Sequence, residues 1–135
     1  MAGLVVDCSA FLPLCFEDEA SEISEAMLER VVKAGAMVPA IWWYEIRNVL
    51  VVNERRGRIE ASQSEEFLSL LGRLPLSIVM EEQPGLVLRF ARAYSLSAYD
   101  AAYLALAREH ALPLATLDQR LAGAAARAEV AVFGS

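Results

Sequence analysis

Hydrophobic positions along this chain follow two alternating spacings. Short apolar runs alternate with longer segments in which apolar residues recur every three or four positions. Short runs bounded by turn residues predict buried strands, whereas the longer spacing predicts amphipathic helices. The predicted strands cover residues 4–7, 36–40, 76–80, 113–116 and 130–133. Because helical segments separate these strands, the sequence predicts an α/β fold with a central, mostly parallel sheet of about five short strands, covered by helices on both faces.

The helical spacing predicts a helix in each of the intervening segments. These helices cover residues 10–16, 21–35, 40–56, 62–74, 84–94, 97–112 and 117–128. The helix over 21–35 has the clearest boundaries, because Ser21 is a favourable N-cap and Gly35 a common stop. Its inward face is predicted to carry Ile23, Met27, Leu28, Val31 and Val32.

The segment "SLSAYDAAYLALAREH", residues 95–110, has almost no polar face. A helix that is apolar all round is a buried helix. Nevertheless, Asp100 stands in its first turn. Ser97 and Asp100 fit a capping box, in which the two side chains hydrogen-bond to each other's backbone, and this box alone would explain the acid. The alternative is that Asp100 belongs to a functional site at the mouth of the helix.

The size and composition of the chain indicate one soluble domain, residues 1–135. It is 56% hydrophobic and 22% charged, so it can bury a core. The longest apolar run, residues 34–44, is too short to span a bilayer, and the N-terminus lacks the basic region of a signal peptide. Cys8 and Cys15 look like small core residues in a reducing compartment. We therefore expect a cytoplasmic protein that does not associate with membranes.

The net charge of −6 argues against a nucleic-acid partner only until its location is considered. Residues 17–30 alone hold six acids and one base. The rest of the chain is nearly neutral and has a basic cluster, made of Arg47, Arg55, Arg56 and Arg58. These arginines could contact the phosphates of an RNA backbone. The alternative, which we favour, is that they are solvated and paired with Glu54 and Glu60.

Four acids occupy positions where an α/β sheet usually carries its site. Asp7 closes the first predicted strand, Asp118 follows the fourth, and Asp100 opens a helix. Ligands of such sheets bind beyond the carboxyl ends of the strands. Glu45 lies on an apolar stripe of the helix over 40–56, so it faces inward or toward a cleft.

Each acid also has a structural explanation. Asp7 could cap the next helix, Asp118 could stabilise the positive end of its helix, and Glu45 could pair with a buried arginine. Together, however, converging carboxylates repel one another, and a hard cation such as Mg²⁺ or Mn²⁺ relieves the repulsion. Such a cluster suits metal-assisted hydrolysis of phosphodiesters. Ser9 and Thr116 stand near Asp7 and Asp118 in the sequence and could orient a ligand or a water molecule.

Four segments, "VVDCSAFL", "PAIWWYEIRNVL", "LSAYDAAYLALA" and "LATLDQRL", resemble in order and spacing the four motifs of PIN-domain proteins, most closely VapC-type toxins. The resemblance covers essentially the whole chain and implies the three-layer PIN fold. It assigns the acidic, metal-binding quartet of the family to Asp7, Glu45, Asp100 and Asp118, and its supporting hydroxyls to Ser9 and Thr116. It implies an endoribonuclease that uses Mg²⁺ or Mn²⁺, forms a homodimer in a prokaryotic cytoplasm, and is neutralised by a VapB-like antitoxin.

An aromatic block next to Glu45 suggests where an antitoxin would bind. At least one of Trp42, Trp43 and Tyr44 must point away from the core, and exposed aromatic residues often mark interfaces. The predicted antitoxin groove is formed by Phe11, Leu12, Phe16, Trp42 and Trp43. Packing of these side chains in the core is an equally good explanation. Tyr99 and Tyr103 are interpreted as core residues.

Two other functions fit parts of the pattern. A PIN-like nuclease could process RNA outside any toxin–antitoxin pair. A doubly wound phosphoacceptor signalling domain would also place acids at strand ends, but it usually needs paired acids near the first strand and a late lysine. Here Asp7 stands alone, and the only lysine is Lys33.

Overall fold

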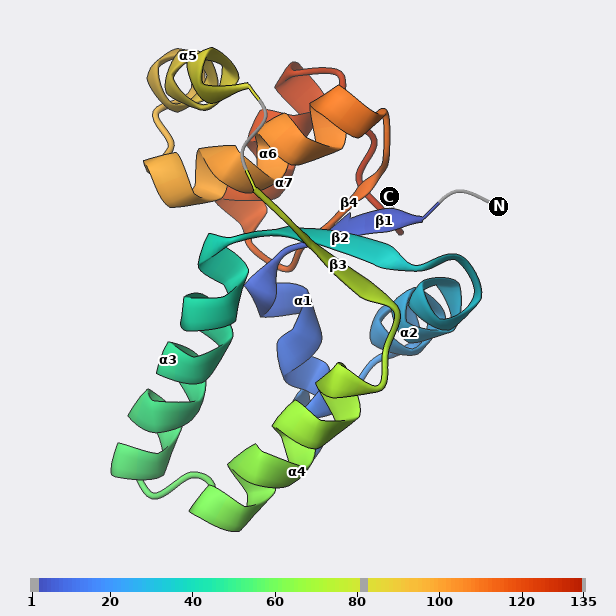
Figure 1. Cartoon of the computed structure of the whole chain (residues 1–135), viewed down its shortest axis with the longest axis vertical. Coiled ribbons are helices and arrows are strands. Elements are labelled where there is room, and N and C mark those ends of the chain that lie inside the picture. Colours follow the sequence, from blue (N-terminus) through green and yellow to red (C-terminus); the bar gives the residue numbers. More distant parts are fainter. Residues whose placement is uncertain (1–2, 81–82, 135) are drawn as a thin grey trace.

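The computed structural model describes residues 3–80 and 83–134, with Glu17 described by its backbone alone. Its centre is a parallel sheet with the strand order β3-β2-β1-β4 (Figure 1). The strands are β1 (Leu4–Val6), β2 (Ala36–Pro39), β3 (Leu76–Val79) and β4 (Leu114–Ala115). The predicted α/β fold with a parallel sheet is therefore confirmed.

The predicted fifth strand is wrong as a full strand. Instead of a ladder over 130–133, the described residues contain one parallel bridge between Leu114 and Val132. Leu114 donates its N–H to the carbonyl of Ala131 and accepts from the N–H of Phe133, at 2.8 and 2.9 Å. Since β4 has only two residues, it offers too little backbone to pair a longer neighbour.

Helices cover both faces of the sheet (Figure 1). In this view α5, α6 and α7 lie on one side of the sheet, and α1, α2, α3 and α4 lie on the other. The α-helices are α1 (Cys8–Phe11), α2 (Glu22–Ala34), α3 (Ile41–Arg55), α4 (Ala61–Gly72), α5 (Pro84–Tyr94), α6 (Ala98–His110) and α7 (Gln119–Arg127). Two short 3₁₀ helices, η1 (Leu12–Leu14) and η2 (Glu17–Glu19), follow α1. The helix predicted over 10–16 is thus divided between α1 and η1. No helix in the described part of the chain is both long and apolar enough to cross a membrane.

The apolar helix α6 is the main helical element of the core. It packs against β1 and β2 from one face of the sheet. Its buried residues are Ala101, Tyr103, Leu104, Ala105, Leu106 and Ala107. Burial on nearly all sides, as the sequence predicts, is confirmed for the middle of the helix. Tyr99 in its first turn is 60% exposed, so its assignment to the core is wrong.

The inward face of α2 differs from the prediction. Met27 and Val31 are buried as expected, but Ile23 and Val32 are 49% and 59% exposed. Ser24 is buried in their place. Its hydroxyl accepts from the Ser21 N–H at 2.9 Å and donates to the Ser21 carbonyl at 2.8 Å. Because these bonds satisfy the hydroxyl, the serine side chain can be buried. The buried face of α2 therefore passes through Ser24, Met27 and Val31 and not through Ile23 and Val32.

The register of the sheet brings two distant segments together at its carboxyl edge. Val6 of β1 is paired with Ala115 of β4. Asp7 follows Val6 and Thr116 follows Ala115, so these two residues leave the sheet side by side. The Asp7 N–H donates to the Ala115 carbonyl at 2.9 Å, which extends the pairing to the site.

Candidate active site

Asp7 lies at the centre of the carboxyl edge and is only 6% exposed. Its Oδ2 accepts hydrogen bonds from Ser9 Oγ at 2.6 Å and from Thr116 Oγ1 at 2.8 Å. The alternative that Asp7 caps α1 through its side chain is wrong, since that side chain makes no capping bond to the helix. Both hydroxyl bonds instead fix the carboxylate in the space beyond the strands.

The two hydroxyls are themselves held by the backbone of the β4–α7 loop. Ser9 Oγ accepts from the Leu117 N–H at 2.9 Å, and Thr116 Oγ1 accepts from the Asp118 N–H at 3.0 Å. Because an ionised carboxylate can only accept hydrogen bonds, both hydroxyls are the donors in their bonds to Asp7. The structure thus places the two predicted supporting hydroxyls against Asp7, one of the four predicted site acids.

Burial is the main cause that raises the pKa of the Asp7 carboxyl above its ordinary value. The hydroxyls of Ser9 and Thr116 lower this pKa, because they donate to the charged form. The negative charge of Asp118 raises it again. Two predicted site acids are therefore close enough to repel each other.

Asp118 is the N-cap of α7. Its Oδ1 accepts from the N–H groups of Arg120 and Leu121 at 2.9 and 3.3 Å. The structural explanation of this acid is thus correct, and it also fixes where the carboxylate sits. A cap places a negative charge at the positive end of the helix and at the carboxyl edge of the sheet at the same time.

Asp100 is placed by a helix start of a different kind. Its N–H donates to Ser97 Oγ at 3.1 Å, so Ser97 caps α6. Between these two described residues the structure has no return bond from the carboxylate to the Ser97 N–H, so the expected capping box is only half formed. The cap therefore does not explain the carboxylate of Asp100, which is half-buried at the mouth of α6.

Glu45 projects from α3 and is half-buried. The idea that it pairs with a buried arginine is wrong. Its Oε1 accepts a 2.6 Å hydrogen bond from the hydroxyl of Tyr103, which has no exposed surface. Sequence reasoning assigned Tyr103 to the core and missed this contact. Tyr103 comes three residues after Asp100, so the two side chains lie on neighbouring parts of one helix face. This spacing is the sequence signal that could have placed Tyr103 near the site.

Mutual repulsion extends over the other acids. Burial is again the first cause that raises the pKa of Glu45, and the charges of Asp7 and Asp100 add to it. The pKa of Asp100 is raised by burial first and then by the charges of Asp7 and Asp118. Arg120 is the cation that opposes this last effect. Acids that follow β1, lie in α3 and α6, and cap α7 thus come within electrostatic reach of one another at one edge of the sheet.

This donor set fits a hard divalent cation in its chemistry. The side chains present oxygen atoms alone. Burial first, and then repulsion from neighbouring carboxylates, raises the pKa values of Asp7, Glu45 and Asp100. Among the described residues, no three His, Cys, Asp or Glu side chains are arranged so that they could share one ion directly. Mg²⁺ usually keeps several waters and takes one or two carboxylates directly, so an acid farther away contacts it through water.

Two arginines of the basic cluster, Arg47 and Arg58, make contacts with other side chains or backbone groups of the protein. Arg47 lies 3.5 Å from the centroid of the Trp43 ring and donates to the Trp43 carbonyl. Arg55 and Arg56 are exposed at the end of α3. Among the arginines predicted to contact RNA, these two are therefore more exposed to solvent than Arg47.

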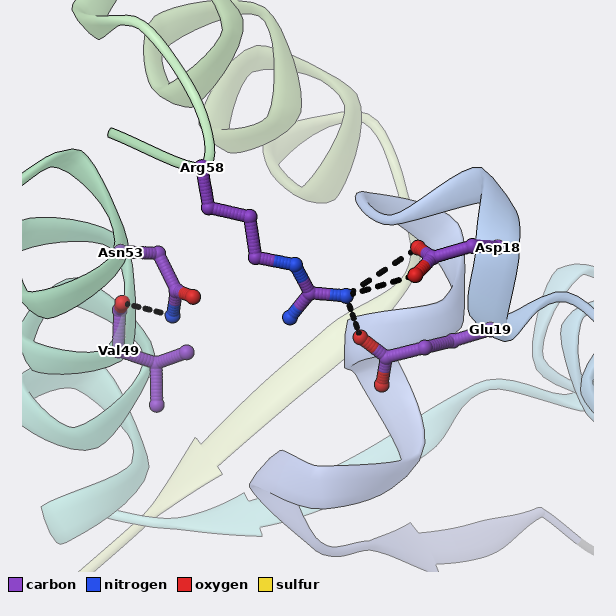
Figure 2. A network of polar contacts seen from close by, with 5 residues as sticks. All are labelled: Asp18, Glu19, Val49, Asn53 and Arg58. Carbon is purple, nitrogen blue, oxygen red and sulfur yellow. Dashed lines mark hydrogen bonds and ion pairs between the residues drawn. The ribbon is translucent and has the colours of Figure 1, made fainter. Parts of the chain in front are cut away.

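Arg58 bridges the α3–α4 turn to η2 (Figure 2). Its Nη2 donates to Asp18 and to Glu19 Oε2, the latter at 2.7 Å. The expected pairing with Glu54 and Glu60 is wrong for this residue, since the acids it meets come from a segment about forty residues earlier. Glu54 instead accepts from the hydroxyl of Ser64.

The residues of the predicted antitoxin groove separate into two groups. Phe11, Phe16 and Trp42 are at most 5% exposed and belong to the core. Trp43 is 43% exposed, and Leu12 is half-buried. As the chain is folded here, the groove prediction can therefore concern only Leu12 and Trp43.

Comparison with known proteins relates this chain to PIN domains and to a VapC ribonuclease. Residues 4–127 match the family described as PIN domain. Ribonuclease VapC3 from Pyrobaculum aerophilum is 31% identical over 126 residues, which cover 88% of this chain and 92% of the relative. The crystal structure of PAE2754, also from Pyrobaculum aerophilum, superposes with a TM-score of 0.65 at 28% identity and covers 91% of this chain and 86% of that one.

A more distant structure shares the fold. It is described as a toxin–antitoxin complex from Klebsiella pneumoniae and superposes with a TM-score of 0.61. The identity is 20%, and the match covers 90% of this chain and 92% of that chain. At this identity the similarity concerns the fold alone.

Proposed function

This chain belongs to the PIN-domain family, among its VapC-type ribonucleases, and we propose that it is an endoribonuclease that hydrolyses RNA phosphodiester bonds with Mg²⁺ or Mn²⁺. One observation carries the proposal. Asp7 is buried at the carboxyl edge of the sheet. Its negative charge repels those of Glu45 and Asp100, and the charge of Asp118 repels that of Asp7. Repelling carboxylates at one strand edge are the arrangement that a hard cation stabilises.

One or two of the four acids would bind the cation directly and the others through water, and Ser9 and Thr116 would hold Asp7 in position. When bound, the cation neutralises charge on the phosphate and lowers the pKa of a water molecule. A carboxylate with a raised pKa is a better proton acceptor than an ordinary one, because its conjugate acid is weaker. Asp100 and Glu45, both half-buried, are the acids suited to accept the proton of the attacking water.

The same family membership supports a proposal about partners. We propose that the chain forms a homodimer in a prokaryotic cytoplasm and is neutralised by a VapB-like antitoxin. The fold shared with a toxin–antitoxin complex supports this partner. The negative charge of the four site acids would attract a basic side chain of such an antitoxin.

The signalling alternative has little structural support. Lys33 lies in the last turn of α2, directly before β2 begins at Ala36. In a parallel sheet the start of β2 and the end of β1 are at opposite edges. Lys33 therefore cannot accompany Asp7 as the lysine of a phosphoacceptor site would. A PIN-like nuclease that acts outside a toxin–antitoxin pair keeps the same site and differs only in its biological partner.

Mapping of cleavage ends on total RNA tests the proposal. The wild type with Mg²⁺ should create discrete new RNA ends, and Asp7→Asn, purified in the same way, should create none. Ends that appear equally with both proteins, or cleavage that persists in excess chelator, would contradict the proposed reaction. Growth arrest on expression, relieved by the product of an adjacent small reading frame, would separate the toxin from the RNA-processing alternative.

A further inference from the structure

We propose that Tyr103 is a positioning residue that holds the Glu45 carboxylate ready for the cation. This inference rests on the proposed function and adds a residue to its machinery. It is carried by one contact, the 2.6 Å hydrogen bond from the Tyr103 hydroxyl to Glu45 Oε1. The two residues are 58 positions apart in sequence and lie on α6 and α3.

The donor in this contact is rigid. Tyr103 has no exposed surface and is among the largest fully buried side chains of the molecule. Its ring is enclosed by the core, so the hydroxyl projects from a fixed point in a fixed direction. A tyrosine hydroxyl can donate one hydrogen bond, and here the carboxylate of Glu45 accepts it.

Glu45 needs such support more than the other acids do. Asp7 is fixed by two hydroxyls, and Asp118 is fixed by two backbone N–H groups. Asp100 has a short side chain and stands in the first turn of a buried helix. Glu45 has the longest side chain of the four, and α3 gives it no comparable local bond. The contact with Tyr103 therefore replaces local fixation.

The position of Tyr103 also links two parts of the site. Asp100 and Tyr103 belong to the same helix, three residues apart, so one rigid element presents one acid directly and orients a second acid. Partners that orient a metal ligand typically change metal affinity or activity by 10- to 100-fold when they are removed. A tyrosine that merely filled the core would have no such effect.

Mn²⁺ titration calorimetry on the intact protein separates these roles, since it does not depend on RNA cleavage. Tyr103→Phe removes the hydroxyl and keeps the ring, and we expect its Mn²⁺ affinity to fall by roughly 10-fold. Tyr99→Phe, on the same helix but 60% exposed, is the matched control and should bind Mn²⁺ like the wild type. Thermal unfolding without metal shows whether each variant is folded before it is titrated.

A double-mutant cycle tests whether Tyr103 acts through Glu45. In a Glu45→Gln background, Tyr103→Phe should cause no further loss of Mn²⁺ affinity, because the carboxylate that it orients is gone. Equal losses in both backgrounds would overturn the inference, as would a Tyr103→Phe protein that binds Mn²⁺ like the wild type.

Cleavage assays distinguish the failure of this inference from the failure of the proposed function. If the wild type cleaves RNA and Tyr103→Phe is folded, kcat measured at one Mn²⁺ concentration below the wild-type Kd for the metal should fall by roughly 10-fold, while the KM for RNA is unchanged. An unchanged kcat would overturn the inference and leave the proposed function intact. A wild type that binds Mn²⁺ but cleaves no RNA would overturn the proposed function, while the calorimetric cycle still decides the role of Tyr103. A wild type that binds no Mn²⁺ overturns both.

Discussion

Thr116 donates a 2.8 Å hydrogen bond to Asp7 across 109 residues of sequence. This bond exists because β1 and β4 are adjacent parallel strands in register, Val6 beside Ala115, so the residues that follow them emerge side by side. The Thr116 hydroxyl also accepts a hydrogen bond from the N–H of Asp118. One hydroxyl thus joins two acids of the site.

Asp7→Asn should abolish RNA cleavage without weakening the fold. The amide keeps the shape of the carboxylate but removes a buried charge that Asp118 repels. In metal-free buffer the free energy of unfolding should therefore be equal to or higher than that of the wild type. Urea unfolding in chelator measures this, and a clear loss of stability would mean that the acid serves the fold rather than a cation.

The metal-free wild type should lose stability as the pH rises above the ordinary pKa of its carboxyls. The carboxyls of Asp7, Glu45 and Asp100 have raised pKa values in the folded protein, with burial as the first cause. Above the ordinary value of 3.8 for aspartate, the folded state therefore binds more protons than the unfolded state, and stability falls with pH until these groups are ionised.

Urea unfolding at a series of pH values, always in chelator, measures that slope. Asp7→Asn should show a shallower fall than the wild type over the same range, because one of the three groups is missing. Saturating Mg²⁺ should flatten the slope or reverse it, since the cation binds the ionised form. A stability that rose with pH equally in wild type and variant would contradict the assignment of Asp7.

Thr116→Val should destabilise the protein and impair cleavage together. The substitution keeps the shape of the side chain, removes one of the two donors to Asp7, and leaves the Asp118 N–H without its acceptor. Loss of such a bonded pair costs roughly 1–3 kcal/mol. Thr116→Ser retains the hydroxyl and serves as the control. Denaturation and cleavage assays on both variants check the prediction, and a fully active Thr116→Val would refute the supporting role.

Two substitutions of Asp118 should separate its structural role from its role in the site. Asn is as good an N-cap as Asp, whereas Ala is a poor one, and the difference is about 1 kcal/mol. Asp118→Asn should therefore retain the metal-free stability of the wild type, and Asp118→Ala should lose about that amount. Both should lose cleavage, because both lack the charge. If Asp118→Asn cleaved RNA normally, its carboxylate would be a helix cap alone.

Much of the fold could be predicted because the apolar spacing is local and strong. The all-apolar segment that became α6 and the four short strands required only neighbouring residues to be recognised. The strand predicted over 130–133 failed because strand formation depends on a partner, and β4 is only two residues long. The exposure of Ile23 and Val32 also could not be foreseen, since it depends on Ser24 satisfying its own hydroxyl within the cap.

The site shows the same division between local and distant information. The acids could be located because strand ends and helix starts are visible in the sequence and share one edge in a parallel sheet. The role of Tyr103 could not, because a tyrosine among alanines and leucines has the pattern of a core residue, and its partner Glu45 is set only by the packing of α3 and α6. Arg58 was likewise expected to pair within its own region, whereas it binds Asp18 and Glu19 of η2.

The central claim is that Asp7, Glu45, Asp100 and Asp118 together bind a divalent cation. Anomalous diffraction from crystals grown or soaked with Mn²⁺ tests it most directly, because the signal locates the ion itself. The account predicts a manganese peak among these four carboxylates, and its loss in Asp7→Asn crystals treated in the same way. A peak elsewhere on the protein, or no peak at the carboxyl edge of the sheet at saturating Mn²⁺, would contradict it.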